Sequence, residues 1–191
     1  YLHPKYFTPS SSVLEEYNVK ENNYVFMREI SNSSLNYSHL ETGISKKLIR
    51  AIRNKGYKIL LSLEDKSKTH KYSEFCQILK DPVSDIFSLI KFAAFSICSG
   101  DSMARESGVL GTPCVYVGGR DMHILEDLYK RDIIFNANSV SSAISIVENI
   151  IEHNLKTISL ESSENAIKNE WHDTTQVILD HTFYRISGEE S

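Results

Sequence analysis

Residues 95–117 read Phe95-Ser-Ile-Cys-Ser-Gly-Asp-Ser-Met-Ala-Arg-Glu-Ser-Gly-Val-Leu-Gly-Thr-Pro-Cys-Val-Tyr-Val117, and they contain the clearest signal of the fold. Residues 95–98 form a short apolar run that is typical of a buried strand. A polar turn follows, and residues 102–110 then favour a helix that stops at a Gly-Thr-Pro break. A second apolar run begins at Cys114. This order predicts two buried strands connected by a short helix.

The same alternation extends along most of the chain. Short strands that are apolar throughout, separated by amphipathic helices, indicate a parallel sheet with both faces covered. We therefore predict an α/β fold, a doubly wound Rossmann-like parallel sheet of five to six strands with helices on both faces. The expected strands are residues 24–28, 58–62, 76–79, 95–98, 114–117 and 133–135, and the expected helices are 13–17, 44–55, 83–94, 102–110, 125–130 and 140–154.

Three parts are expected along the chain. Residues 1–12 contain two prolines and a serine run, which suit an extended lead-in. Residues 13–160 form the main domain. Residues 161–191 form a C-terminal helical tail, which follows a polar gap at 156–163 and stays helical to near Tyr184. Because the opening residues look like a connector, we expect the chain to be one part of a longer protein.

The turn at residues 99–102 is the first candidate site. It opens a helix, so free backbone N–H groups gather at a positive helix end that suits phosphate or pyrophosphate. Glu106 lies four residues after Ser102, one turn deeper on the same helical face, where a carboxylate can accept hydrogen bonds from both hydroxyls of a ribose. The alternatives are that Asp101 or Ser102 simply caps the helix and that Glu106 is solvated.

Other polar groups are expected at the same edge of the sheet. Ligands of doubly wound sheets bind outside the carboxyl ends of the strands, which here places the loops at 29–43, 62–73, 79–85, 99–102 and 118–123 together. Arg120 follows two glycines and is either a phosphate contact or a solvated side chain in a flexible turn. His39 is either an acid, base or sugar contact or an incidental loop residue. Trp171 and Tyr184 are expected to be core contacts, with a stacking platform as the alternative.

Composition excludes several classes of function. The net charge is −4 and no basic stripe is visible, which argues against nucleic acid as a partner. The three cysteines lack metal-ligand spacing and suit reduced core residues of a cytoplasmic protein, so we predict no metal site. No apolar run is long enough to form a transmembrane segment.

The stretch from Gly100 to Pro113 resembles the nucleotide-sugar motif in the C-terminal half of GT-B proteins. That group includes UDP-N-acetylglucosamine 2-epimerases and the N-acetylglucosaminyltransferase of peptidoglycan synthesis. Both have a small-residue turn, a Glu six residues after its first Gly or Ser, and Gly-x-Pro five residues after the Glu, matched here by Gly100, Glu106 and residues 111–113. The fuller pattern, including residues 2–4, 7–9 and 173–175, resembles a bacterial and archaeal family of unknown function in the same superfamily.

The resemblance implies roles for individual residues. The first helical turn would offer N–H groups to a diphosphate and Glu106 would bind the ribose. The loop at 79–82 would lie against the base, and Arg28 would lie near the phosphate or sugar. No cofactor is implied. The nucleotide-binding residues are thus expected to be Gly100, Asp101, Ser102, Met103, Glu106, Arg28 and Pro82.

The leading hypothesis is the nucleotide-diphosphate-sugar-binding half of a GT-B glycosyltransferase-like enzyme, with a UDP-sugar as ligand. Its catalytic residues are not identified and would belong mostly to a missing N-terminal domain, so this half is not expected to be active alone. An epimerase or hydrolase of the same superfamily, or a noncatalytic nucleotide-binding module, is the alternative. The epimerase pattern has paired glycines and two adjacent acids, whereas this chain has Asp101-Ser102 and Arg105-Glu106.

Overall fold

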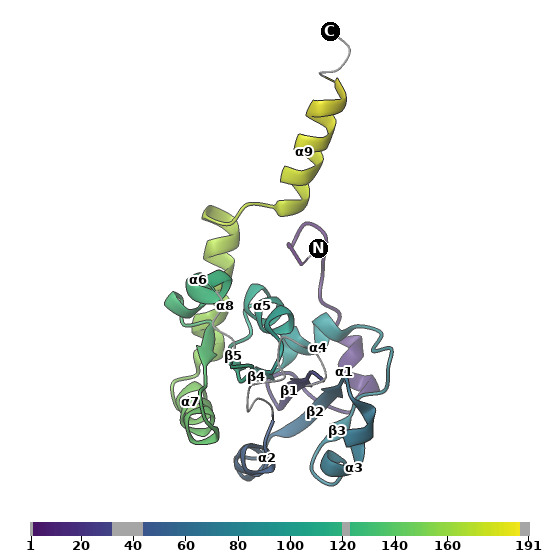
Figure 1. The fold of residues 1–191 in the computed structure, drawn as a ribbon, viewed down its shortest axis with the longest axis vertical. Helices are drawn as coiled ribbons and strands as arrows, with labels where there is room; N and C mark the ends of the chain where they lie inside the picture. Colours follow the sequence, from purple (N-terminus) through teal and green to yellow (C-terminus); the bar gives the residue numbers. More distant parts are fainter. Residues whose placement is uncertain (1, 32–43, 120–122, 188–191) are drawn as a thin grey trace.

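The computed structural model describes residues 2–31, 44–119 and 123–187 and shows a six-stranded, fully parallel sheet (Figure 1). The strand order is β3-β2-β1-β4-β5-β6, which is the doubly wound order of Rossmann folds, so the predicted fold class is confirmed. The strands are β1 (Tyr24–Glu29), β2 (Lys58–Leu63), β3 (Gln77–Ile78), β4 (Phe95–Cys98), β5 (Cys114–Tyr116) and β6 (Ile134–Asn136).

Helices cover both faces of this sheet. Because successive side chains of a strand point to opposite faces, Val25 and Met27 of β1 join one core cluster, and Tyr24 and Phe26 join another. The first cluster lies under α2 (Lys46–Asn54) and α7 (Val140–Glu152). The second lies under α1 (Ser12–Glu16) and α4 (Ile86–Phe92), and a third cluster lies beside α5 (Asp101–Val109) and α6 (Glu126–Lys130).

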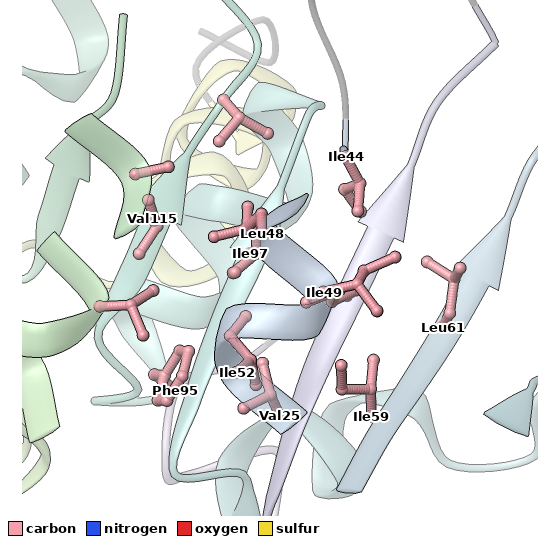
Figure 2. Packing of buried hydrophobic residues seen from close by; sticks show 14 of the residues in the cluster. Val25, Ile44, Leu48, Ile49, Ile52, Ile59, Leu61, Phe95, Ile97 and Val115 are labelled. Atoms are coloured by element: carbon pink, nitrogen blue, oxygen red, sulfur yellow. The ribbon is translucent and has the colours of Figure 1, made fainter. Parts of the chain in front are cut away.

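The packing of α2 shows why its sequence folds as it does. Leu48, Ile49 and Ile52 share one helical face and are fully buried against Val25 and Ile97 of the sheet (Figure 2). The opposite face of the helix carries lysine and arginine.

The remaining elements are short. The connection from β2 to β3 contains a 3-10 turn, η1 (Lys66–Lys68), and α3 (Thr69–Tyr72), and a second 3-10 turn, η2 (His123–Leu125), precedes α6.

The predicted polar gap at 156–163 is wrong, because α8 (Leu155–Asn169) runs straight through it. Two serines that suggested a loop are buried in the helix, and each donates its hydroxyl to a backbone carbonyl. Ser159 bonds Asp132 O at 3.2 Å and Ser163 bonds Val109 O at 2.8 Å. Small side chains on this face let the neighbouring backbone approach. A Cβ at Gly111 would lie 2.8 Å from Leu160 Cα.

The last helix, α9 (Thr174–Ser187), extends away from the body of the domain (Figure 1). The N-terminal segment lies beside the start of α9. It forms a turn, in which Tyr6 N–H donates to His3 O at 2.8 Å. The two segments are joined by a hydrogen bond from the Tyr6 hydroxyl to Asp173 Oδ2 at 2.9 Å. None of the helices in the described part of the chain has the length and apolar character needed to cross a bilayer.

Candidate functional site

The candidate site lies where the strand order reverses direction. β1 and β4 are neighbours at the centre of the sheet, and the chain proceeds from them toward opposite edges. The two strand ends are tied together, because the Ser99 hydroxyl accepts a hydrogen bond from Ile30 N–H at 2.9 Å. In open α/β sheets this switch point is where ligands bind.

Helix α5 begins directly at this point, at an N-cap residue that has no side chain. Three of the helices that cover the sheet are capped by a side chain, whereas α8 has no such cap within the described part of the chain. Ser45, Asp85 and Ser139 accept a hydrogen bond from the first turns of α2, α4 and α7. In α5 the N-cap is Gly100, and no side-chain cap is found among the described residues. The first N–H groups of any helix have no partner within the helix, and the helix dipole favours negative charge there, so this turn suits an anion.

Close packing explains why glycine stands at two positions around this turn. A Cβ at Gly100 would lie 2.8 Å from the Ile30 side chain. A Cβ at Gly118, in the loop after β5, would lie 2.4 Å from both Ser99 O and the Tyr116 hydroxyl. The loops after β1, β4 and β5 are thus packed on one another without room for a methyl group.

The outer face of α5 forms the floor of a cavity of about 710 Å³. Ser102 and Glu106 lie on this floor, as their spacing predicts, together with Arg105 and Val109. The other walls come from the two ends of the chain. They are Leu2 and His3 of the N-terminal segment, Ile167 of α8, residues 171–175 and Ile178 of α9.

The remaining predicted residues lie outside the cavity lining. Met103 is half-buried and packs between two core clusters. Asp101 opens the helix and forms an ion pair with Arg105 at 3.6 Å. Arg28 Nη1 donates to Ser62 Oγ at 2.7 Å on the neighbouring strand. Pro82 is exposed, in the loop between β3 and α4. The structure thus brings Ser102 and Glu106 together in a cavity, but it brings neither Arg28 nor Pro82 there.

Two other candidates, His39 and Arg120, lie outside the described residues. The cysteines are buried free thiols as expected, and burial raises the pKa of the Cys98 thiol. In the portion of the chain that the structure describes, no group of three or more His, Cys, Asp or Glu side chains could hold a metal ion.

The cavity also contains residues that the sequence did not single out as site residues. His3 and Asp173 come from opposite ends of the chain, so no local pattern could have paired them. Trp171 packs against the third core cluster, as expected, and it also lines the cavity. The Tyr6–Asp173 hydrogen bond and a 3.2 Å bond from Lys5 Nζ to Gln176 Oε1 fasten the two chain ends over α5.

Comparison with solved structures supports the assignment of the fold. The S. aureus MnaA–UDP structure matches with a TM-score of 0.63 and 11% identity, over 93% of this chain and 49% of that one. UDP-GlcNAc 2-epimerase of Methanocaldococcus jannaschii, in complex with UDP-GlcNAc and UDP, gives 0.52 and 14%, over 74% and 42%. The wall teichoic acid polymerase TagF gives 0.54 and 15%, over 93% and 47%. At these identities the likeness concerns the fold, which is the Rossmann-like fold of GT-B proteins.

Comparison of the sequence with known proteins identifies a relative and a matching protein family. An uncharacterised protein of Methanocaldococcus jannaschii is 25% identical over 159 residues, which are 82% of this chain and 46% of that protein. The chain thus spans about half the length of the proteins that it matches. The model of one family matches residues 2–186, nearly the whole sequence. The chain therefore belongs to the family described as "Protein of unknown function (DUF354)".

Proposed function

We propose that this chain is the nucleotide-diphosphate-sugar-binding half of a GT-B glycosyltransferase-like enzyme, with a UDP-sugar as donor. The observation that carries the proposal is that α5 begins at the switch point without a side-chain cap from the described residues, and that Ser102 of its first turn and Glu106 one turn deeper line the same cavity. The solved structures of similar fold include proteins bound to UDP and UDP-GlcNAc, which supports this class of ligand.

Each part of the ligand has a chemical counterpart in the site. The diphosphate would accept hydrogen bonds from the backbone amides of residues 100–103 and gain from the positive helix end. Glu106 would accept hydrogen bonds from both ribose hydroxyls. When the bond between sugar and diphosphate breaks, charge accumulates on the leaving diphosphate. Fixed amides aimed at that charge stabilise the transition state.

The catalytic base and the acceptor site are assigned to the other half of a protein of the relatives' length. A sugar-nucleotide epimerase or hydrolase would use the same donor site, and the likeness to UDP-GlcNAc 2-epimerases favours it as the second candidate. The sequence argues against the epimerase reaction, because Asp101-Ser102 stands where the epimerase pattern has paired glycines and Arg105-Glu106 where it has two adjacent acids. Product analysis distinguishes the two, because an epimerase needs no acceptor.

Calorimetric titration of the 191-residue chain with UDP tests the donor site. We expect Glu106→Gln to weaken UDP binding about tenfold, because hydrogen bonds to a charged group contribute about 1.5–3 kcal/mol and 1.4 kcal/mol is a factor of ten. Glu161→Gln is the matched control, since Glu161 is exposed on α8 and outside the cavity. Equal affinity of the wild type and Glu106→Gln for UDP would show that Glu106 does not bind the nucleotide.

A further inference from the structure

We infer that the outward face of α2, together with α3, docks this domain on an anionic phospholipid bilayer. The face consists of Lys46, Arg50 and Arg53 of α2, Lys71 of α3 and the half-buried ring of Phe75, and we call it the basic face. None of these residues lines the cavity above α5, so the inference goes beyond the proposed function and does not depend on it.

The charges of the chain are distributed unevenly. Residues 44–74, which include α2, β2 and α3, contain nine lysines and arginines and three acidic residues, whereas the whole chain contains 21 and 25. The net charge of −4 therefore conceals a locally positive region. Such asymmetry of charge indicates attraction to a negatively charged partner.

The three cations of α2 form a stripe along one side of the helix. Lys46, Arg50 and Arg53 are four and three residues apart, which places them on one helical face over about 10 Å of its axis. Lys46 Nζ lies 5.8 Å and Arg50 Cζ 5.3 Å from the centroid of the Phe75 ring. Arg53 Nη1 donates to Glu74 O at 3.4 Å. The stripe therefore borders the connection from α3 to β3, and the two segments share one surface.

The cations of the basic face keep their charge available for a partner. Other lysines of this region are neutralised within the fold, since Lys68 pairs with Glu29 at 2.8 Å and Lys66 pairs with Asp81 at 2.7 Å. All four cations of the basic face are exposed. Among the described residues, no carboxylate lies within ion-pair distance of any of them.

The packing of α2 favours a flat partner. Its apolar side is committed to the core, where Leu48, Ile49 and Ile52 are fully buried (Figure 2). The helix lies on the sheet and presents only its side, so it does not enter a nucleic-acid groove or the acyl region of a bilayer. The headgroups of anionic lipids form a flat negative surface, which attracts lysine and arginine within a Debye length of about 8 Å.

A bilayer on the basic face leaves the candidate site accessible. Ile97 of β4 belongs to the cluster beneath α2, and its neighbour Cys98 belongs to the cluster beside α5. Because successive side chains of a strand point to opposite faces, the two helices cover opposite faces of the sheet (Figure 1). A domain docked in this way keeps the cavity above α5 open to solvent.

Co-sedimentation of the 191-residue chain with lipid vesicles tests the inference. Vesicles of phosphatidylcholine alone are compared with vesicles that also contain phosphatidylglycerol, at low and at high salt. We expect binding only to the vesicles with phosphatidylglycerol, and we expect it to weaken as salt shortens the Debye length. Binding of a labelled DNA duplex is measured in parallel.

Two double variants with the same change in net charge provide the second readout. Lys46→Gln with Arg50→Gln should weaken vesicle binding roughly thirtyfold, because each lysine or arginine near an anionic surface contributes about 1 kcal/mol. Lys130→Gln with Lys168→Gln is the matched control, since both lysines are exposed and lie on α6 and α8. The control should bind vesicles as the wild type does. Thermal unfolding shows that both variants are folded.

Every outcome supports or overturns the inference. Selective loss of binding to phosphatidylglycerol vesicles in the Lys46/Arg50 variant establishes the docking face. Equal binding by the two variants, equal binding to both kinds of vesicle, or no binding to either kind overturns it. Binding of the duplex without binding of vesicles also overturns it and assigns the face to nucleic acid. The proposed function is tested separately, because the Lys46/Arg50 variant should bind UDP as the wild type does.

Discussion

At the scale of single residues, the first turn of α5 affects both the stability of the helix and the binding of an anion. A helix start favours a negative charge, which a side chain or a bound anion can supply. Here the N-cap is Gly100, and Ser102 on the first turn is exposed to the cavity. A carboxylate at position 102 should therefore stabilise the helix and at the same time compete with a bound diphosphate.

Ser102→Asp is expected to change stability and affinity in opposite directions. The free energy of unfolding should stay the same or rise by about 0.3–1 kcal/mol, because the new charge lies at the positive helix end. UDP affinity should fall at least tenfold, because like charges a few ångströms apart repel by several kcal/mol near a protein surface. Urea unfolding and calorimetry measure the two effects. Ser102→Asn, which is uncharged, is the control and should bind UDP nearly as the wild type does; an equal loss in both variants would contradict a phosphate at this position.

The spacing between Ser102 and Glu106 could be predicted because helix geometry alone determines it. Trp171 could not be placed in the same way. Its position depends on Asp127, an indole partner that lies 44 residues away in the chain, and on the Arg131 guanidinium. A single sequence carries no signal for such contacts.

At the scale of elements, strand and helix positions followed from local patterns wherever the burial of an element matched its hydrophobicity. The strand at 95–98 has the predicted bounds because all four residues are buried. Helix α8 is the exception, because part of its buried face consists of serines whose hydroxyls donate to backbone carbonyls.

Helix α8 also contains a buried amine, that of Lys156. Lys156 Nζ donates to Lys91 O at 2.7 Å and to Thr112 Oγ1 at 2.6 Å, which connects the start of α8 to the end of α4 and to the residue before Pro113.

This amine should make the stability of the fold depend on pH. Burial lowers the pKa of Lys156 to about 7, whereas an unfolded lysine titrates near 10.4. Between these values the unfolded chain binds more protons than the folded chain, so stability should rise with pH from about 7 to about 10. Burial also lowers the pKa of Lys91, which acts in the same direction.

Urea unfolding at pH 7 and pH 9 measures this dependence. In Lys156→Met the rise in stability between the two pH values should be clearly smaller, because the main titrating group is gone and only the contribution of Lys91 remains. Lys168→Met, at an exposed position of the same helix, is the control and should keep the full rise. An unchanged rise in Lys156→Met would show that the amine is not desolvated in the folded state.

At the scale of the whole molecule, the cavity is built by parts that are far apart in the sequence. Its floor is a helix at the centre of the sheet, and its other walls are residues 2–3 and the region from Ile167 to Ile178. The hydrogen bond between Tyr6 and Asp173 holds these ends together. Sequence patterns predicted the helix that forms the floor and two of its polar residues, Ser102 and Glu106. They could not predict the enclosure, because it depends on the path of both chain ends over α5.

Diffraction from crystals soaked with UDP would show whether the first turn of α5 and Glu106 bind a nucleoside diphosphate. We expect density for a diphosphate within hydrogen-bond distance of the backbone amides of residues 100–103, with both ribose hydroxyls on the Glu106 carboxylate. Density for UDP at another place on the domain, with the cavity above α5 left without nucleotide, would contradict it.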